Sequence, residues 1–344
     1  MGEKVFLPEW APQSAVLMAW PHINSDWAYM LEEVQKCVKE IITSITEFQP
    51  VVLLVPSASV QKELEPIFPN HVIYRIIETN DTWARDFGPI FIEQEEKLIA
   101  LDFKFNGWGL KFSANKDNLI TQQLFESALF SENIEYANRL NFVLEGGALE
   151  SDGEGTLLTT SECLLSPNRN GEWDKIQIEA YLKNELGINR VLWLNHGYLA
   201  GDDTDSHIDT LARFCSPDSI AYVQCLDEKD EHFDQLQKME EELKAFRTNE
   251  GKPYQLIPLP MADEVQFDDH RLPATYANFL IINGAVLVPT YNSEKDKLAI
   301  SQLEVAFPNH EIIGVNCLPL IKQHGSLHCV TMQLPKSVLR SEIL

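Results

Sequence analysis

The stretch LEEVQKCVKEIITSITEFQPVVLLV (31–55) places a helical pattern directly before a run of apolar residues. Val34, Val38 and Ile41 recur at the three- and four-residue spacing of an amphipathic helix. The run VVLLV (51–55) is short, rich in β-branched residues and uninterrupted, which is typical of a strand buried on both faces. The stretch therefore predicts a helix followed by a buried strand, as in an α/β fold.

The same combination recurs along the chain. Helical patterns cover residues 117–130, 174–187, 233–246 and 297–307, and short β-branched runs flank each of them. These later helices start roughly 60 residues apart, as expected when one supersecondary unit is repeated about five times. A doubly wound sheet also alternates strands and helices, so that alternative stays open. However, no G-x-G-x-x-G opens a helix after the first strand and no GK[ST] motif occurs, which disfavours a nucleotide-cofactor fold.

Length and composition narrow the class of protein. The 344 residues suffice for a large core, and no linker or low-complexity tract divides them, so we expect a single domain over 1–344. The formal charge of -25 repels phosphate backbones and anionic lipids, which argues against nucleic-acid and membrane partners. The six cysteines form no C-x-x-C, and no signal segment or long apolar run is present, so we expect a soluble cytoplasmic protein.

Four polar, glycine-containing clusters lie between the expected strands, where binding groups often sit on loops. They are NDTWARDFGP (80–89), LEGGALESDGEG (144–155), GDDTDSHIDTLARF (201–214) and GSLHC (325–329). In the first cluster, Asp86 precedes the expected strand PIFIE, where its carboxylate could accept from a cationic donor. An ordinary surface pair of Arg85 with Asp86 is the alternative.

The acid-rich third cluster is compatible with a metal site or with an acid/base site. Its spacing lacks the glycine-kinked loop and terminal glutamate of a calcium site, and it lacks the further His or Cys that zinc requires. If residues 206–210 are extended, His207 and Asp209 project to the same face. Together with Cys329 they supply the parts of a cysteine-dependent hydrolytic site, although a buried cysteine can also serve core packing alone.

At this point the sequence resembles the agmatine deiminase family of the guanidino-modifying (pentein) superfamily. Bacterial peptidyl-arginine deiminase-like proteins share much of the same set of motifs. The matching motifs run through nearly the whole chain: PEWAPQSAVLMAWP, NDTWARDFGPI, DFKFNGWG, LEGGALESDGEGTLLTT, CLLSPNRN, GDDTDSHIDTLARF, LPATYANFLIING, VPTY and GSLHCVTMQLP. So many ordered matches are far more specific than any one of them.

The resemblance implies a five-bladed α/β propeller of ββαβ-type units around a central site. It also implies roles for individual residues: Cys329 as nucleophile, His207 as general acid/base, Asp86 and Asp209 as the carboxylates that hold the guanidinium, Glu145 as the carboxylate that orients the histidine, Trp83 as a wall of the substrate slot, and Asp202 or Asp203 as the partner of a distal amine. The family often has G-G-G-x-I-H-C before the nucleophile, whereas this chain has His324 and Ser326 in HGSLHC. His328 adjoins the nucleophile, but neighbours on a strand face opposite ways, so we expect it to be a poorer base than His207.

The implied reaction is the hydrolysis of agmatine to N-carbamoylputrescine and ammonia through an amidino-cysteine intermediate, without a metal or an organic cofactor. Deimination of arginine or peptidyl-arginine is the alternative within the enzyme class, and a catalytically silent ligand-binding protein is the alternative outside it. The clusters are dominated by acids, apart from Arg85 and Arg213, which suits dicationic agmatine better than a substrate with a carboxylate. The oligomeric state stays open, and a homo-oligomer is one alternative.

Overall fold

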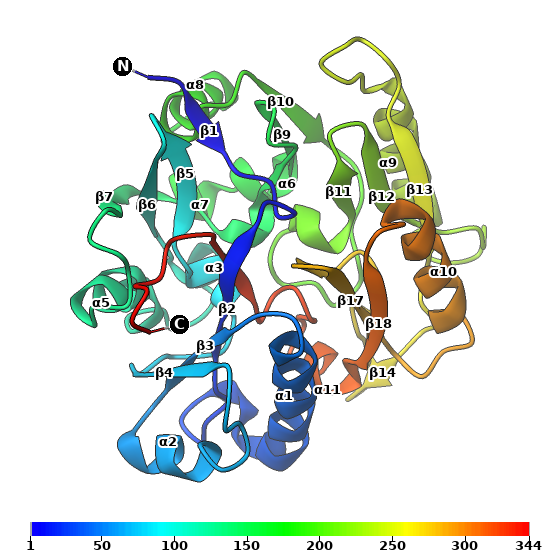
Figure 1. Cartoon of the computed structure of the whole chain (residues 1–344). Helices are drawn as coiled ribbons and strands as arrows, with labels where there is room; N and C mark the ends of the chain where they lie inside the picture. The colour runs from blue at the N-terminus through cyan, green and yellow to red at the C-terminus, as the bar shows by residue number, and fades with distance from the viewer. Residues whose placement is uncertain (1, 344) are drawn as a thin grey trace.

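The computed structural model describes residues 2–343, so Met1 and Leu344, the ends of the predicted domain, lie outside the described residues. The fold is mixed α/β with several small sheets (Figure 1). The strands, grouped by sheet, are β1 (Lys4–Phe6), β5 (Ile90–Gln94), β6 (Lys97–Lys104) and β7 (Glu135–Val143); β8 (Glu150–Ser151), β9 (Thr156–Thr160) and β10 (Arg190–Leu194); β11 (Ala212–Ser216), β12 (Ser219–Gln224) and β13 (Gln255–Pro260); β14 (Gln266–Phe267) and β15 (His270–Arg271); β16 (Leu280–Ile282), β17 (Ala285–Thr290) and β18 (Glu311–Asn316); and β19 (Met332–Pro335), β2 (Gln13–Ala19), β3 (Val51–Val55) and β4 (Val72–Ile76).

Helices connect these strands. The α-helices are α1 (Leu31–Thr46), α2 (Ala58–Leu64), α3 (Ala84–Phe87), α4 (Gly107–Leu110), α5 (Ile120–Glu126), α6 (Ser161–Leu164), α7 (Pro167–Asn170), α8 (Lys175–Leu186), α9 (Phe233–Ala245), α10 (Asp296–Ala306) and α11 (Leu318–Ile321). The 3-10 helices are η1 (Asp26–Met30), η2 (Asp117–Leu119), η3 (Gly146–Ala148) and η4 (Ile208–Thr210). Helices α5, α8, α9 and α10 lie at the outside of the molecule (Figure 1).

One strand pattern recurs in five of the sheets. In each, an antiparallel pair is followed by a parallel pair: β19–β2–β3, β5–β6–β7, β8–β9–β10, β11–β12–β13 and β16–β17–β18. The parallel connections pass through α1, α5, α8, α9 and α10 respectively. The helix-plus-strands units predicted from the sequence are thus confirmed.

The first predicted unit shows why these residues form these elements. Helix α1 buries Val34, Val38 and Ile41 on one face, and every residue of β3 is buried. Strand β3 is paired in parallel with both β2 and β4, which explains its uninterrupted apolar run. The predicted helix at 117–130 is shorter than expected, because α5 ends at Glu126 and Ala128 has a φ of 53°, outside the helical region.

The last strand of the chain joins the same sheet as the second strand. Strand β19 pairs antiparallel with β2, with Met332 opposite Leu17. The large apolar core extends across these elements, and a smaller cluster packs between α8 and the strands around it. Within residues 2–343, no helix is both long and apolar enough to cross a membrane.

Candidate active site

Polar residues from five distant parts of the chain occupy similar positions in the five units, two to five residues before the first strand of each. These residues are Asp86 before β5, Glu145 before β8, Asp209 before β11, Asn278 before β16 and Cys329 before β19. Because the units share one strand pattern, equivalent positions can bring their side chains into one region. The contacts below show that they do.

A pocket with about 390 Å³ of empty space opens beside these segments. Trp83, Asp86, Asp203 and Cys329, all proposed from the sequence, line it. Trp108, from the segment DFKFNGWG, forms a further part of the wall. The structure therefore combines a thiol, carboxylates and indole rings in a single hollow, a combination suited to a planar organic cation.

Cys329 lines this pocket although only 7% of the residue is exposed. Its Sγ lies 3.8 Å from Asp209 Oδ2, and Asn278 Nδ2 donates to the sulfur over 3.3 Å. Burial raises the pKa of the Cys329 thiol well above its ordinary value, and the charges of Asp209 and Asp86 raise it further. The free site therefore favours the thiol, whereas a cation bound beside these carboxylates favours the thiolate.

Asp86 is held by two fixed donors. Trp108 Nε1 donates to its Oδ2 and the Gly147 backbone N–H donates to its Oδ1, each over 2.9 Å. His207 Nδ1 lies 3.6 Å from the same Oδ1. Burial raises the pKa of Asp86 and Asp209 adds to this, although His207 opposes both. A bound cation would oppose this shift and favour the carboxylate.

Gly147 lies between His207, the acid/base candidate, and Asp86 and Asp209, the candidates for binding the guanidinium. A Cβ built on this residue would lie 2.6 Å from His207 Nδ1, 2.8 Å from Asp86 Oδ1 and 3.3 Å from Asp209 Oδ2. The first two distances are too short for a methyl group beside buried polar atoms, and the third is tight. The backbone at Gly147 therefore approaches all three side chains as closely as it does because the residue has no side chain.

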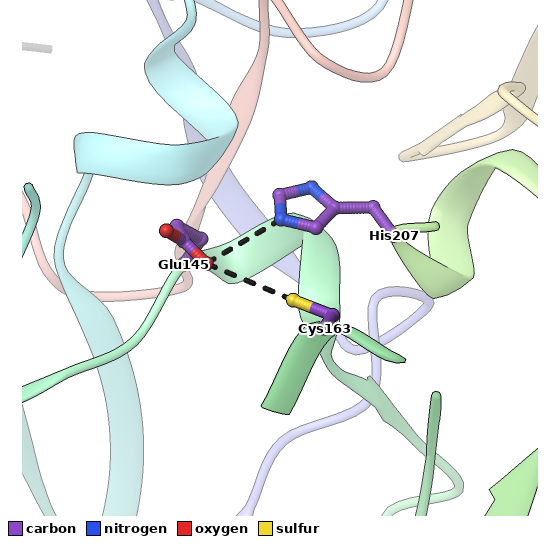
Figure 2. A group of neighbouring side chains, drawn as sticks. All are labelled: Glu145, Cys163 and His207. Atoms are coloured by element: carbon purple, nitrogen blue, oxygen red, sulfur yellow. Dashed lines mark hydrogen bonds and ion pairs between the residues drawn. The ribbon is translucent and has the colours of Figure 1, made fainter. Parts of the chain in front are cut away.

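His207 is almost completely buried between two carboxylates. Its Nε2 lies 3.5 Å from Glu145 Oε2, as Figure 2 shows, while Nδ1 faces Asp86. Burial lowers the pKa of His207, but the charge of Asp86 and the contact with Glu145 outweigh it, so the pKa is raised well above its ordinary value. The imidazolium form is thus favoured, and it can donate a proton to a leaving group.

Glu145 is fixed by groups on the side away from the pocket. Arg169 Nε donates to both of its oxygens, over 3.0 and 2.7 Å, and Cys163 Sγ lies 3.8 Å from Oε2 (Figure 2). Burial raises the pKa of Glu145, but Arg169 and His207 outweigh it, so the pKa is lowered. Glu145 is therefore an anchored anion against which the His207 ring can be oriented.

Asp209 belongs to a buried chain of charges. His328 Nδ1 lies 2.8 Å from Asp209 Oδ2, and His328 Nε2 lies 2.5 Å from Glu9 Oε2. Arg213 donates to Glu9 over 2.7 Å and also to Glu150. Both ring nitrogens of His328 face carboxylates. Burial raises the pKa of Asp209, but the bond and charge of His328 outweigh it, so the pKa is lowered and Asp209 stays anionic.

Comparisons with known proteins agree with this geometry. The model of the Porphyromonas-type peptidyl-arginine deiminase family matches residues 5–335. The chain belongs to this family. A curated relative from Legionella pneumophila (strain Philadelphia 1), named "Putative agmatine deiminase", is 33% identical over 96% of this chain and 94% of its own length.

Solved structures from the family superpose closely. A structure described as the "Putative Arginine Deiminase from Porphyromonas gingivalis" is 52% identical with a TM-score of 0.94, covering 98% of this chain and 100% of that one. C. jejuni agmatine deiminase with substrate bound is 42% identical with a TM-score of 0.91, covering 98% and 97%. A dimethylarginine dimethylaminohydrolase at 10% identity and an amidinotransferase at 14%, each with a TM-score of 0.50, show that the fold is related to the pentein fold.

The loop 201–205 of this family member separates the acids that the sequence grouped together. Asp202 accepts from the backbone N–H groups of Thr204 and Ser206, so it caps the turn and does not line the pocket. Asp205 pairs with Lys111 and with Arg169. Asp203 alone of the three lines the pocket. Of the two acids expected at a distal amine, only Asp203 therefore lies at the pocket, and its role in binding stays a prediction.

The extended conformation considered as a condition for residues 206–210 is not present. Ser206 has a φ of 60°, and Ile208–Thr210 forms the 3-10 helix η4. His207 consequently reaches Glu145 and Asp86, whereas Asp209 reaches His328 and Cys329. The two side chains converge on the site from one turn, with Gly147 between them, and not from one face of a strand.

The side chains of Trp83 and Arg85 belong to the same short segment but line different pockets. Trp83 lines the pocket and packs against Gly325, where a Cβ would lie 2.2 Å from the indole ring. Arg85 is buried and donates to Gln333 over 2.6 Å, with Nη2 3.6 Å from Glu9. The surface pair of Arg85 with Asp86 is therefore excluded. Arg85 instead lines a second pocket of about 620 Å³, which lacks Cys329 and His207.

Several residues of the site were not singled out from the sequence. They are Asn278, Trp108, Arg169 and Gly147, which lie in the quoted motifs LPATYANFLIING, DFKFNGWG, CLLSPNRN and LEGGALESDGEG. Asn278 has the most contacts with the nucleophile, because its amide bonds both the Cys329 sulfur and the Cys329 backbone N–H. In the sequence, Asn278 is recognisable only as an asparagine just before a β-branched run. That pattern does not indicate which residue the asparagine contacts.

Two groups within the described residues combine metal-ligating side chains. They are Glu145, Cys163 and His207, and Glu9, Glu150 and His328. In each group an arginine already pairs with a carboxylate: Arg169 in the first and Arg213 in the second. A nearby guanidinium repels a cation and occupies the oxygens that would bind it. Both groups are therefore better described as buried ion-pair clusters.

Proposed function

We propose that the protein is an agmatine deiminase that hydrolyses agmatine to N-carbamoylputrescine and ammonia through a covalent intermediate on Cys329. The observation that carries the proposal is that Cys329 and Asp86 line one pocket, while Asp209 lies directly behind the thiol and His207 lies against Asp86. Relatives named agmatine deiminase, one solved with its substrate, support it.

Asp86 and Asp209 are the groups that hold the guanidinium. A guanidinium only donates hydrogen bonds, and it matches the geometry of carboxylate oxygens. Trp108 and Gly147 fix Asp86 on one side, while His328 fixes Asp209 on the other. Both carboxylates are already held in place before the substrate binds. Little side-chain freedom is therefore lost when the complex forms. Trp83 forms a wall of the slot for the planar cation.

Binding of the substrate also activates the nucleophile. The charges of Asp209 and Asp86 raise the pKa of the Cys329 thiol in the free site. A guanidinium between these carboxylates compensates their charge, so the thiol pKa falls and its proton passes to the solvent. The thiolate therefore forms only when the substrate is bound, with the sulfur facing the central carbon of the guanidinium, and not in the empty pocket.

The chemistry proceeds in two halves. In the first, the Cys329 thiolate bonds to the guanidinium carbon, a C–N bond breaks, and His207 protonates the departing ammonia. In the second, the now neutral His207 accepts a proton from water, whose oxygen bonds to the same carbon as the C–S bond breaks. The electrons of that bond return to the sulfur, and the second proton of the water leaves the oxygen to restore the Cys329 thiol, so the product is the neutral carbamoyl group. Glu145 holds the His207 ring throughout.

The acids in the pocket wall favour agmatine over arginine. Asp26, Asp81 and Asp203 line the pocket, so a distal ammonium can meet carboxyl groups there. Arg85 and Arg213 are the two basic residues noted within the acid-rich clusters. Both form ion pairs with Glu9 and neither lines this pocket. A substrate carboxylate would find acids instead of a basic partner, which disfavours arginine and peptidyl-arginine.

We also propose an overall architecture and a cellular location for the protein. The five repeated units support a single propeller domain with five blades, since β19 joins the end of the chain to β2. We further propose a cytoplasmic enzyme of putrescine formation that acts on a small cation and needs no cofactor. A homo-oligomer stays an alternative to a monomer.

The test is a substrate panel on the purified protein. Ammonia and carbamoyl products are measured with agmatine, free arginine and a peptide with a C-terminal arginine. The proposal expects the largest kcat/KM for agmatine. A higher kcat/KM for arginine or for the peptide would show that the protein is an arginine or peptidyl-arginine deiminase instead. If none of the three compounds gives a product, a ligand-binding protein is favoured.

A further inference from the structure

The second pocket, which Arg85 lines, shares no lining residue with the catalytic pocket. It has about 620 Å³ of empty space, compared with about 390 Å³ for the catalytic pocket. Strands β1, β5, β8 and β19 and the segment 7–12 between β1 and β2 contribute to its wall. Arg85 directly precedes Asp86 in the chain, and Gly146, which also lines the second pocket, directly precedes Gly147. The two pockets are therefore adjacent but separate.

Arg85 supplies the second pocket with two buried donors. The residue is only 3% exposed, and its Nη1 donates to Gln333 over 2.6 Å. In the part of the chain that the structure describes, no group forms a hydrogen bond with the buried Nε or Nη2 of Arg85. These two nitrogens lie side by side on one edge of a guanidinium, an edge that can form paired hydrogen bonds with a carboxylate. Buried donors without a partner are costly, so this edge is suited to a ligand that accepts from both.

The two glutamates in the pocket wall are already paired with other groups. Glu9 Oε2 lies 3.6 Å from Arg85 Nη2, too far for a hydrogen bond. The same oxygen accepts from Arg213 over 2.7 Å and lies 2.5 Å from His328 Nε2. Glu150 also pairs with Arg213. The negative charges of these glutamates repel a dianion such as phosphate more strongly than a monoanion, so a ligand with a single negative charge fits better.

Much of the remaining wall is apolar. It includes the side chains of Phe6, Leu7, Pro12, Ile90, Phe91 and Leu149. A hollow with an apolar wall and one cationic group suits a molecule that has an apolar body and one anionic end. We infer that the second pocket binds a small apolar monocarboxylate, whose two oxygens accept from Arg85 Nε and Nη2 while its hydrocarbon part contacts the apolar wall. The acids that line the catalytic pocket disfavour the same anion there.

Isothermal titration of the full-length protein tests the inference, with 3-phenylpropanoate as the probe. The comparison ligand is 3-phenylpropanamide, which has nearly the same shape but no charge. Arg85→Lys keeps the positive charge and removes the paired donors. Its matched control is Arg190→Lys, because Arg190 bonds protein acceptors through Nε, Nη1 and Nη2 and does not line the pocket. Ala11→Trp fills the pocket from its wall and leaves Arg85 unchanged, so it tests the site even if Arg85→Lys does not fold.

The inference predicts that the parent protein binds 3-phenylpropanoate about tenfold or more tightly than the amide, as expected for hydrogen bonds between charged groups. Arg85→Lys and Ala11→Trp should each weaken binding of the carboxylate by about tenfold or more, whereas Arg190→Lys should leave it unchanged. Equal binding of the two ligands by the parent, or an unchanged affinity in folded Arg85→Lys or Ala11→Trp, would overturn the inference. No binding of the carboxylate by the parent would also overturn it and would mean that water alone satisfies the Arg85 donors.

Discussion

The Asn278 side chain bonds the nucleophile Cys329 at two points, its sulfur and its backbone. Asn278 Nδ2 donates to Cys329 Sγ over 3.3 Å, while Oδ1 accepts the Cys329 backbone N–H over 3.3 Å. The same oxygen accepts the backbone N–H of His328 over 2.8 Å, and Nδ2 also reaches Asp209. One amide thus fixes the loop that carries the thiol and stabilises the thiolate.

Asn278→Ala should lower kcat by about a hundredfold, similar to the loss of one donor from an oxyanion site. The bond from Asn278 lowers the thiol pKa, so its removal raises that pKa and shifts the rising limb of the kcat/KM profile to higher pH. The matched control is Asn283→Ala, because Asn283 bridges Gln13 and Gln49 away from the pocket. Both variants should lose stability, but an equal loss of kcat in the control would contradict a catalytic role.

Gly147→Ala should reduce kcat/KM by about a hundredfold or more, because a methyl group there meets His207 and Asp86 at less than 3.0 Å. Steady-state rates and thermal unfolding measure the two effects separately. Gly314→Ala is the control, since its Cβ would meet only Thr290 and Ile300, at 3.1 and 3.3 Å. Normal activity in Gly147→Ala would mean that the three polar groups do not converge as described.

Arg169→Met should destabilise the protein by about 3–5 kcal/mol at neutral pH, because it leaves Glu145 buried without its arginine. The pKa of Glu145 is lowered in the folded protein, so the pair contributes fully above the ordinary glutamate pKa and is lost as pH falls through the lowered value. Urea unfolding at neutral and acidic pH should therefore show a smaller difference between variant and parent in acid. Arg139→Met, at a partly exposed pair with Glu185, should cost much less.

Agmatine binding should strengthen as pH rises through about 6, because burial raises the pKa of Asp203 to about 6. Asp202 adds to this shift, while His324 and Lys111 oppose it. The carboxylate that receives the ammonium forms only above that pKa. KM for agmatine should accordingly fall between about pH 5 and pH 7, and the fall should be weaker in Asp203→Asn. An identical pH dependence in the variant would assign the titration to another group.

Local sequence patterns predicted the fold well because each unit is built from neighbouring residues. The spacing of Val34, Val38 and Ile41 reports one buried helix face, and the run 51–55 reports a strand covered on both sides. The early end of α5 was not predictable from the apolar pattern, since it depends on the single positive φ of Ala128. Periodicity identifies an element more reliably than it identifies the end of that element.

The sequence named several of the residues that the structure brings together, but it did not predict their mutual geometry. Asp86, His207, Asp209 and Cys329 converge as the resemblance implied, yet residues 208–210 form a 3-10 helix and not the extended segment that was considered. The ion pairs of Glu9 with Arg213 and His328 join residues more than 200 positions apart, and no local pattern reports such contacts. Asn278 was missed for the same reason.

The most direct test of a Cys329-dependent agmatine deiminase is a rapid acid quench of the protein during turnover of agmatine, followed by peptide mass spectrometry. The account predicts ammonia release together with a mass increase of one agmatine less one ammonia on the peptide that contains Cys329. Cys329→Ala should fold normally, show no adduct and release no ammonia. Ammonia release by Cys329→Ala at a rate close to that of the parent, or an adduct on a residue other than Cys329, would contradict the account.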